Sequence, residues 1–245
     1  MTSGSTTATS PWFVRPSSTD HAARLFCFPH AGSGASAFSA WPAAIDDVEV
    51  CPVQFPAREN RLAEPHYDTY ENLAADLIGP LTPRLDRPYA LFGHCAGALP
   101  AFETAVLLAE LGLPRPACLF VSGQSAPHDA ASDRMLTMTE PALRAELESV
   151  IRGRGIEPRS DMLDLGMVVL LRDLAAARAY RRTEPVAAPC PLVVLHWRDD
   201  PGVRLDQLSG WRRYADSVDF HGIDGTQHDF MNAPDALRKL LTSWR

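Results

Sequence analysis

The chain has 245 residues, which is long enough to bury a full hydrophobic core and falls in the size range of a single α/β domain. Hydrophobic residues make up 46% of it and charged residues 22%, which excludes a mainly disordered chain. The formal net charge of -7 disfavours a nucleic-acid or membrane partner, and no apolar run reaches the ~20 residues of a membrane-spanning helix. Because the start of the chain also lacks the basic and apolar regions of a signal peptide, we expect a cytoplasmic protein, and we expect a monomer.

The cysteines are mostly core candidates. Four of the five lie within or beside apolar runs, where cysteine behaves as a small core residue: Cys27, Cys51, Cys118 and Cys190. The sequence contains no Cys-x-x-Cys pair, and its histidines do not lie at zinc-ligand spacing from the cysteines. We therefore predict no disulfide, no structural metal and no bound cofactor.

Short apolar runs alternate along the chain with longer helical patterns, which is typical of βα units that build a mostly parallel sheet. Residues 1–11 precede this pattern as a predicted disordered tail, because Ser, Thr, Gly and Ala dominate them. A single α/β domain is predicted over 12–245. In chain order, its expected elements are strand 24–28, strand 48–55, helix 69–85, strand 89–93, helix 98–111, strand 118–122, strand 192–197, helix 205–215, strand 218–223 and helix 234–244.

One segment, 127–184, interrupts the alternation. It contains helical patterns at 140–151 and 162–180 and no strand candidate. Its length far exceeds the roughly dozen residues that a crossover between two strands needs. We interpret the segment as an inserted helical lid; the alternative is that its helices are ordinary crossover packing.

Gly93-His94-Cys95-Ala96-Gly97 follows a predicted strand and opens a predicted helix, which is the context of a nucleophile elbow. Small residues such as Gly93 and Gly97 are needed on both sides of this tight turn, because bulkier ones collide across it. The helix from Ala96 directs its N-terminal dipole at the Cys95 sulfur, so we expect the thiol pKa to fall below its reference value of about 8.5. The alternative is that Cys95 is a fifth core cysteine in a turn that exists for packing.

Two later segments supply the partners that a cysteine nucleophile needs. Asp200, directly before Pro201, is our candidate for the orienting acid, with Asp199 as second choice, although Asp-Asp-Pro-Gly alone is more typical of an exposed turn. His228 lies in a polar loop after the last predicted strand and is the candidate general base. Nucleophile, acid and histidine thus occur in the chain order of α/β-hydrolases. Other histidines lack that loop context and are expected at the surface or in packing: His21, His66, His128, His196 and His221.

The loop after the first predicted strand, 28–34, is rich in glycine and can point backbone N–H groups into a site. We expect the N–H groups of Ala31 and Ala96 to form an oxyanion hole, Ala96 being the residue after the nucleophile. A phosphate-binding loop is disfavoured, because both the Gly-x-Gly-x-x-Gly spacing and a Gly-Lys-Ser/Thr ending are missing.

Three segments, 25–32, 54–61 and 91–94, together resemble the type II thioesterases that serve polyketide synthases and nonribosomal peptide synthetases. Their sequences are Leu-Phe-Cys-Phe-Pro-His-Ala-Gly, Gln-Phe-Pro-Ala-Arg-Glu-Asn-Arg and Leu-Phe-Gly-His. The likeness extends from about residue 24 to the C-terminus, with 120–123 and 126–128 as further matches. It implies an α/β-hydrolase fold in which Cys95, Asp200 and His228 occupy the family's catalytic positions.

The resemblance implies hydrolysis of acyl or aminoacyl thioesters on the phosphopantetheine arm of an acyl or peptidyl carrier protein, beneath a flexible lid that gates an acyl chamber. The sequence departs from the family in having Cys95 where serine is usual, and His196 and Trp197 where glycines are usual. An acyl group on sulfur keeps nearly the energy of the incoming thioester, so it can pass to another thiol or an amine as well as to water. Acyl transfer between two carrier proteins is therefore the alternative, and a non-catalytic carrier-binding module is a further one. Replacement of a natural serine by Cys95 in the laboratory also stays open.

Overall fold

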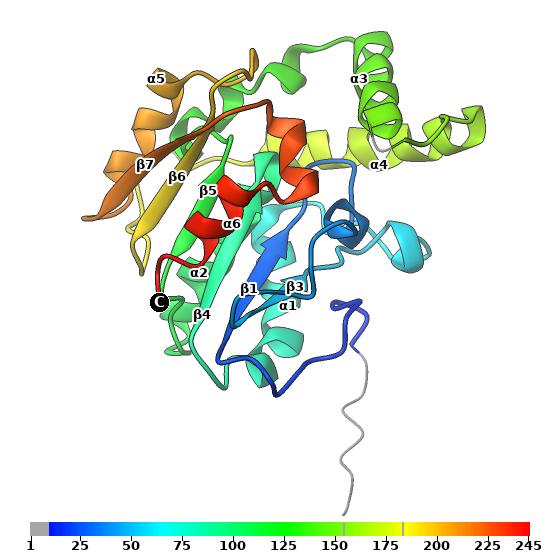
Figure 1. Ribbon diagram of the computed structural model, residues 1–245. Coiled ribbons are helices and arrows are strands. Elements are labelled where there is room, and N and C mark those ends of the chain that lie inside the picture. Colours follow the sequence, from blue (N-terminus) through cyan, green and yellow to red (C-terminus); the bar gives the residue numbers. More distant parts are fainter. Residues whose placement is uncertain (1–9, 154, 183) are drawn as a thin grey trace, which may run out of the picture.

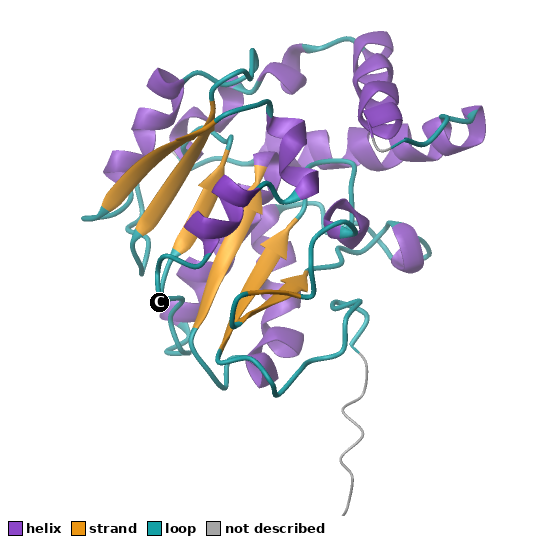
Figure 2. Cartoon of the chain, in the orientation of Figure 1, coloured by secondary structure: helices purple, strands orange, loops and turns teal. Residues whose placement is uncertain are grey.

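The computed structural model describes residues 10–153, 155–182 and 184–245, so most of the tail predicted at 1–11 lies outside the described residues. Within the described part, seven strands form one sheet between two layers of helices (Figure 1; Figure 2). The strand order is β2-β3-β1-β4-β5-β6-β7, and every pair of neighbours is parallel except β2 and β3. The predicted fold class is confirmed. The strands are β1 (Ala23–Phe28), β2 (Ala44–Ile45), β3 (Val48–Pro52), β4 (Tyr89–His94), β5 (Leu119–Ser122), β6 (Leu192–Trp197) and β7 (Val218–Ile223).

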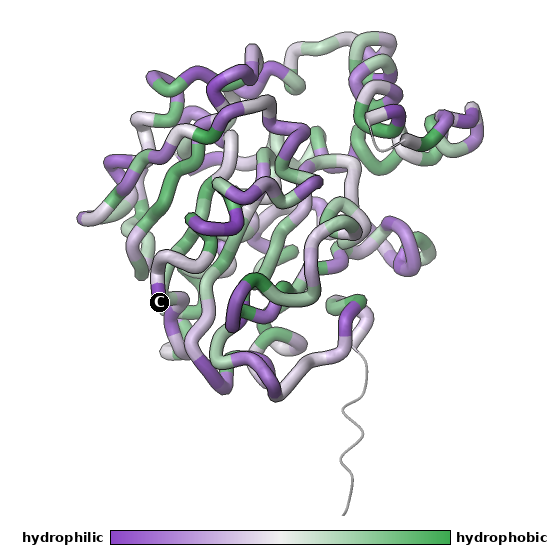
Figure 3. Tube along the Cα trace, viewed as in Figure 1, coloured by the Kyte–Doolittle hydropathy of each residue, from purple (hydrophilic) through white to green (hydrophobic). Residues whose placement is uncertain are grey.

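The central strands are apolar along their whole length because both of their faces are covered. All residues of β1 are buried, with Phe26 and Phe28 packed on one side of the sheet and Leu25 and Cys27 on the other. Figure 3 shows the same pattern as hydrophobic colour concentrated in the middle of the molecule. In the outer strand β7, half-buried and exposed residues alternate at first, and only Ile223 is buried. The sheet is therefore a rigid base on which loops at the carboxyl ends of the strands can be held.

Helices cover the two faces unequally. The first face carries α1 (Tyr70–Leu81) and α2 (Ala98–Glu110), whose Leu73 and Phe102 belong to the same buried cluster as Phe26; the second carries α6 (Asp235–Leu241). Helix α1 begins at Thr69, whose hydroxyl accepts the N–H of Asn72 at 3.1 Å. The helix predicted at 205–215 is divided into α5 (Leu205–Leu208) and a 3-10 turn at Ser209–Arg213.

No helix in the described ranges combines the length and the apolar character needed to cross a membrane.

The segment predicted as a lid lies over the carboxyl ends of the strands (Figure 1). Between β5 and β6 it contains two 3-10 turns, Pro127–Ser132 and Arg134–Thr137, followed by α3 (Glu140–Gly153) and α4 (Ser160–Ala179). These helices share a small apolar cluster of their own, formed by Leu143, Met167, Leu170 and Leu174. The placement brings side chains of both helices above the loop that follows β4.

Candidate active site

The turn after β4 has the geometry of a nucleophile elbow. Cys95 has a φ of 48°, in the left-handed region that non-glycine residues rarely adopt, and it opens a 3-10 turn, Cys95–Gly97, that leads into α2. A Cβ atom on Gly93 would lie 2.3 Å from the Ala98 Cα, and one on Gly97 would lie 2.3 Å from the Pro29 carbonyl oxygen. Glycine is therefore required at both positions for the turn to close.

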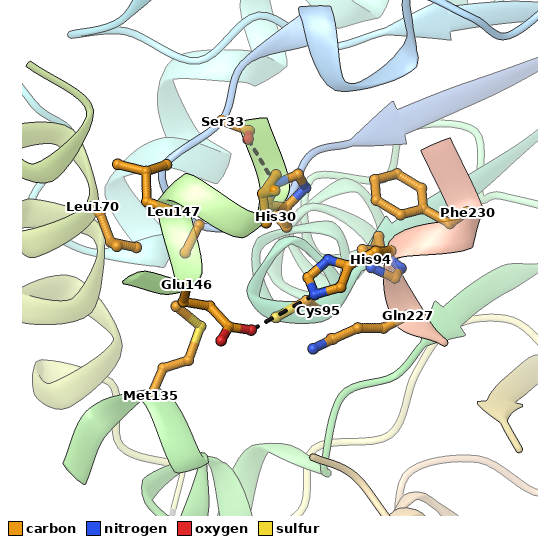
Figure 4. A pocket seen from close by; sticks show the side chains of 13 residues that line it. His30, Ser33, His94, Cys95, Met135, Glu146, Leu147, Leu170, Gln227 and Phe230 are labelled. Atoms are coloured by element: carbon orange, nitrogen blue, oxygen red, sulfur yellow. Dashed lines mark hydrogen bonds and ion pairs between the residues drawn. The ribbon is translucent and has the colours of Figure 1, made fainter. Parts of the chain in front are cut away.

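Cys95 lies at the base of an apolar cavity of about 50 Å³ between the sheet and the lid. Figure 4 shows Cys95 and His94 on one side of the cavity, with Glu146, Leu147 and Leu170 facing them from α3 and α4. A second, more polar cavity on the other side of Cys95 is lined by groups from the lid and from the ends of β5 and β6. The sulfur is thus placed between an apolar and a polar compartment.

The pKa of the Cys95 thiol is higher than the sequence predicts. Burial raises the pKa of Cys95 to about 12, and the Asp133 and Asp200 carboxylates act in the same direction, whereas the Ala96 N–H lowers it. The prediction that the turn lowers this pKa below its reference value was wrong, because it considered the N–H groups of the turn and not the partial burial of the sulfur beneath the lid or the nearby carboxylates. In this closed arrangement the thiol is protonated at neutral pH.

The acidic pair after β6 is divided between two roles. Asp199 is exposed, and its carboxylate accepts the Gly225 N–H at 2.9 Å, as expected of a turn. Asp200 accepts the Gly202 N–H at 2.8 Å through Oδ1, while its Oδ2 is buried and has no hydrogen-bond partner among the described residues. A buried carboxylate oxygen of this kind is costly unless a donor reaches it. This geometry favours Asp200 over Asp199 as a partner for a histidine.

His228 lines the same cavity as Cys95 and lies in a 3-10 turn, Gln227–Asn232, that follows β7. Its Nε2 is 3.6 Å from Glu146 Oε1 on α3, and Glu146 Oε1 also accepts a hydrogen bond from Arg134 at 3.2 Å. Among the described residues, His228 forms no hydrogen bond with Cys95 or Asp200. The three predicted residues are thus gathered at one end of the sheet, with the imidazole held by the lid.

Aromatic contacts fix the backbone on both sides of the cavity. Phe230 stacks on His94 with ring centroids 3.7 Å apart, and its carbonyl accepts the Trp41 Nε1–H at 2.8 Å. The Ser122 hydroxyl lies 2.9 Å from His94 Nδ1 and accepts the Trp197 Nε1–H at 3.0 Å. Burial lowers the pKa of His94 well below its usual range, so this ring stays neutral. Trp197, one of the departures from the usual family sequence, therefore contributes to the support of the elbow.

The candidate oxyanion donors come from two loops that meet. Ala31, after β1, and Ala96, after the nucleophile, line one small cavity, and the Ala96 N–H contacts the Cys95 sulfur. Gly32 has a φ of 78°, and its N–H donates to Asp173 Oδ2 at 2.7 Å. The loop that carries Ala31 is thus tied to the lid helix α4.

Sequence reasoning missed two acidic residues of the site, Glu146 and Asp173. Both lie in helical patterns where an acidic residue is normally solvated, and Glu146 has neighbours of the same kind in α3. The available signal was weak: Arg172 and Asp173 together interrupt an apolar run in α4. His66, expected at the surface or in packing, is buried and lies 2.9 Å from Asp173.

Comparison with known proteins gives the family of the chain. Residues 23–244 match the family model described as the Thioesterase domain. The chain is 35% identical over 200 residues to Thioesterase PikA5 of Streptomyces venezuelae, a match that covers 79% of this chain and 70% of that protein. Similar solved structures include RedJ, a thioesterase of prodiginine biosynthesis in Streptomyces coelicolor, with a TM-score of 0.74, 36% identity and coverage of 94% and 95% of the two chains. Another is YbtT, a type II thioesterase of the yersiniabactin NRPS/PKS pathway, with a TM-score of 0.74, 26% identity and coverage of 93% and 94%.

The parallel sheet and the elbow after β4 define an α/β-hydrolase. Within that class, the chain belongs to the thioesterase family, and the resemblance to the type II thioesterases of polyketide and nonribosomal peptide biosynthesis is confirmed. The protein is therefore a thioester hydrolase.

Proposed function

We propose that this thioesterase releases acyl or aminoacyl groups from the phosphopantetheine arm of acyl or peptidyl carrier proteins, with Cys95 as its nucleophile. The observation that carries the proposal is the position of Cys95, at positive φ on the elbow and in one cavity with His228. The substrate class is supported by the pathways of the similar thioesterases RedJ and YbtT.

The lid must move before such a substrate can bind. A cavity of about 50 Å³ is far smaller than the roughly 300–1,000 Å³ of sites that enclose small ligands. Helix α3 carries Glu146, so its displacement both enlarges the cavity and releases the imidazole of His228. The released ring can then donate from Nδ1 to the buried Oδ2 of Asp200 and present Nε2 to Cys95.

Acylation begins when His228 accepts the Cys95 proton and the thiolate attacks the thioester carbonyl carbon. The N–H groups of Ala31 and Ala96 stabilise the negative charge on the carbonyl oxygen of the tetrahedral intermediate. Collapse of that intermediate breaks the carbon–sulfur bond to pantetheine, whose thiolate takes the proton from His228. An acyl thioester on Cys95 remains, with Asp200 holding the imidazole in the tautomer needed for the next step.

Hydrolysis then requires His228 to remove a proton from water as the water oxygen attacks the acyl carbon. The carbon–sulfur bond breaks, the carboxylic acid is released, and the Cys95 thiolate takes the proton back from His228. The second candidate function is transfer of the acyl group to another carrier-protein thiol. The specific observation that favours it is the sulfur of Cys95, because exchange of one thioester for another is nearly isoenergetic. The third possibility, a binding module without chemistry, is disfavoured by the strained conformation at Cys95.

Intact-mass measurement with an acyl-loaded carrier protein tests the proposal. We expect a mass increase equal to the acyl group on the wild-type chain and free acid in solution, both abolished by Cys95→Ala. Addition of a second, unloaded carrier protein separates the two enzymatic functions, because a transferase loads it faster than acid appears. Absence of adduct, acid and transfer across a broad panel of acyl groups would leave only the binding module.

A further inference from the structure

We propose that Asp173 is a positioning residue for the oxyanion hole: from the lid helix α4 it fixes the loop that presents the Ala31 N–H to the substrate carbonyl. The inference deepens the proposed function and rests on it, because the hole is defined by attack from Cys95.

Asp173 reaches the backbone next to the candidate donor. Its Oδ2 accepts the Gly32 N–H at 2.7 Å, and Gly32 directly follows Ala31. Leu170, one turn earlier in α4, packs on the same residue, with its Cβ 3.3 Å from the position of a Cβ on Gly32. The direction of the Ala31–Gly32 peptide is therefore set by two side chains of the lid and not by the loop alone.

The carboxylate is itself held by the core of the protein. Arg58 donates to both oxygens of Asp173, at 2.7 Å and 2.8 Å, in a two-pronged ion pair, and Tyr67 donates to Oδ1 at 2.8 Å. The His66 Nε2 lies 2.9 Å from the same oxygen. The Asp173 side chain is only 3% exposed, so its position is fixed by these groups. A fixed, charged acceptor can orient a peptide group far more strictly than solvent can.

A network that served only to attach the lid would need side-chain contacts alone. Here one of the two carboxylate oxygens is shared between Arg58 and a backbone N–H beside the reacting centre. The shared oxygen means that loss of the charge directly weakens the hold on the Gly32 N–H and so on the loop. Oxyanion stabilisation depends on donor position within a few tenths of an ångström, so a loosened loop lowers the rate of acyl transfer in particular.

Comparison of two reactions of Cys95 tests this role. Thioester cleavage passes through an oxyanion, whereas alkylation by iodoacetamide does not. We expect Asp173→Asn to lower kcat for propionyl-pantetheine by about 100-fold, with KM and the alkylation rate each within about threefold of wild type. Asp161→Asn, at an exposed acidic residue of the same helix whose carboxylate pairs with Arg159, is the matched control and should leave all three unchanged.

Unchanged kcat in Asp173→Asn would overturn the proposal, as would equal changes in kcat and alkylation, which indicate general disruption of the site. If Asp173→Asn does not fold, the paired substitution Arg58→Met with Asp173→Leu removes both buried charges and leaves the Gly32 N–H without its acceptor. The same selective loss of kcat in that variant supports the proposal, and a wild-type kcat refutes it. Retention of thioester cleavage by Cys95→Ala would refute the nucleophile instead, so the two failures are distinguishable.

Discussion

The two helices of the lid are held in different ways. Helix α4 buries eight residues, of which Ala176 and Ala177 belong to the main core of the protein, and it carries the Asp173 ion pair. Of the described side chains of α3, that of Leu143 alone is buried, and the polar links of this helix to its surroundings are exposed ion pairs. Exposed pairs contribute about 0–1 kcal/mol, whereas breaking a buried pair costs several. We therefore expect α4 to act as a fixed wall of the site and α3 to move as its gate.

The largest expected effect is on the free energy of unfolding, through the buried ion pair of helix α4. Asp173→Ala should lower the free energy of unfolding by about 3–5 kcal/mol, because it leaves the Arg58 guanidinium buried without its partner. Asp164→Ala, which removes an exposed carboxylate 2.7 Å from Arg144, should cost less than about 1 kcal/mol. Urea unfolding of both variants measures the contrast. Equal losses of unfolding free energy would show that the buried pair with Arg58 anchors α4 no more strongly than the exposed pair with Arg144 anchors α3.

The pH dependence of stability tests the same contrast between buried and exposed ion pairs. The Arg58 guanidinium and the other hydrogen bonds hold the pKa of the Asp173 carboxyl far below its usual range, against the opposing effect of burial. Because the folded-state pKa is depressed, this contribution is complete above the unfolded value of about 3.9 and is lost as the pH falls below it. Stability of the wild type should therefore fall between about pH 4 and pH 2 more steeply than that of Asp173→Ala. Parallel curves would contradict a buried, charged Asp173.

The next effect concerns the gate. Glu146→Gln removes the charge that holds His228 to α3, so the open arrangement gains population and the Cys95 thiol, with a closed-state pKa of about 12, becomes easier to ionise. We expect iodoacetamide to alkylate Cys95 about tenfold faster at pH 8, which corresponds to about 1.4 kcal/mol. Glu148→Gln is the control, since Glu148 lies on α3 and pairs with Arg152 at 3.3 Å outside the cavity. A rate unchanged by Glu146→Gln would remove the gate from the mechanism.

The smallest effect tests the contact between the two helices. A Cβ on Gly166 of α4 would lie 2.8 Å from Leu147 Cδ2 of α3. Gly166→Ala gains helix propensity of up to about 1 kcal/mol, but displacement of Leu147 offsets it, so its stability should stay within about 0.5 kcal/mol of wild type. Val168→Ala, at an exposed position of α4, should gain about 0.5 kcal/mol without such a cost. Thermal unfolding distinguishes them, and a full gain by Gly166→Ala would mean that α3 rests only loosely on α4.

The sheet was predictable because its central strands are nearly continuous apolar runs, and six of the seven strands overlap predicted ranges. β2 was missed because two residues, Ala44 and Ile45, carry no periodicity. The predicted helix 205–215 changes to a 3-10 turn after Leu208, where Trp211 is drawn into the core. Local patterns therefore define the elements of this fold better than their ends.

The sequence predicted only those residues of the candidate site that lie in recognisable local motifs and occur in the chain order of α/β-hydrolases. The elbow and the loops after β6 and β7 are local signals, and they led to Cys95, Asp200 and His228, whose catalytic roles stay predictions. The partnership of Arg58 with Asp173 links residues far apart in sequence and depends on how the lid packs, which no local pattern encodes. The raised pKa of Cys95 has the same origin.

The contacts of Phe230 with Trp41 and His94 bear on the order in which the lid opens and His228 reaches Cys95. Trp41 and His94 restrain the backbone two residues beyond His228, so under the proposed mechanism we expect the imidazole to turn from Glu146 toward Cys95 by side-chain rotation and not by movement of this turn. Such rotations take picoseconds to nanoseconds, whereas displacement of a whole helix takes microseconds or longer. Under the proposed mechanism, the base is therefore in place almost as soon as the gate opens, and we expect the frequency of opening, not the rotation of the imidazole, to limit how often the thiol is activated.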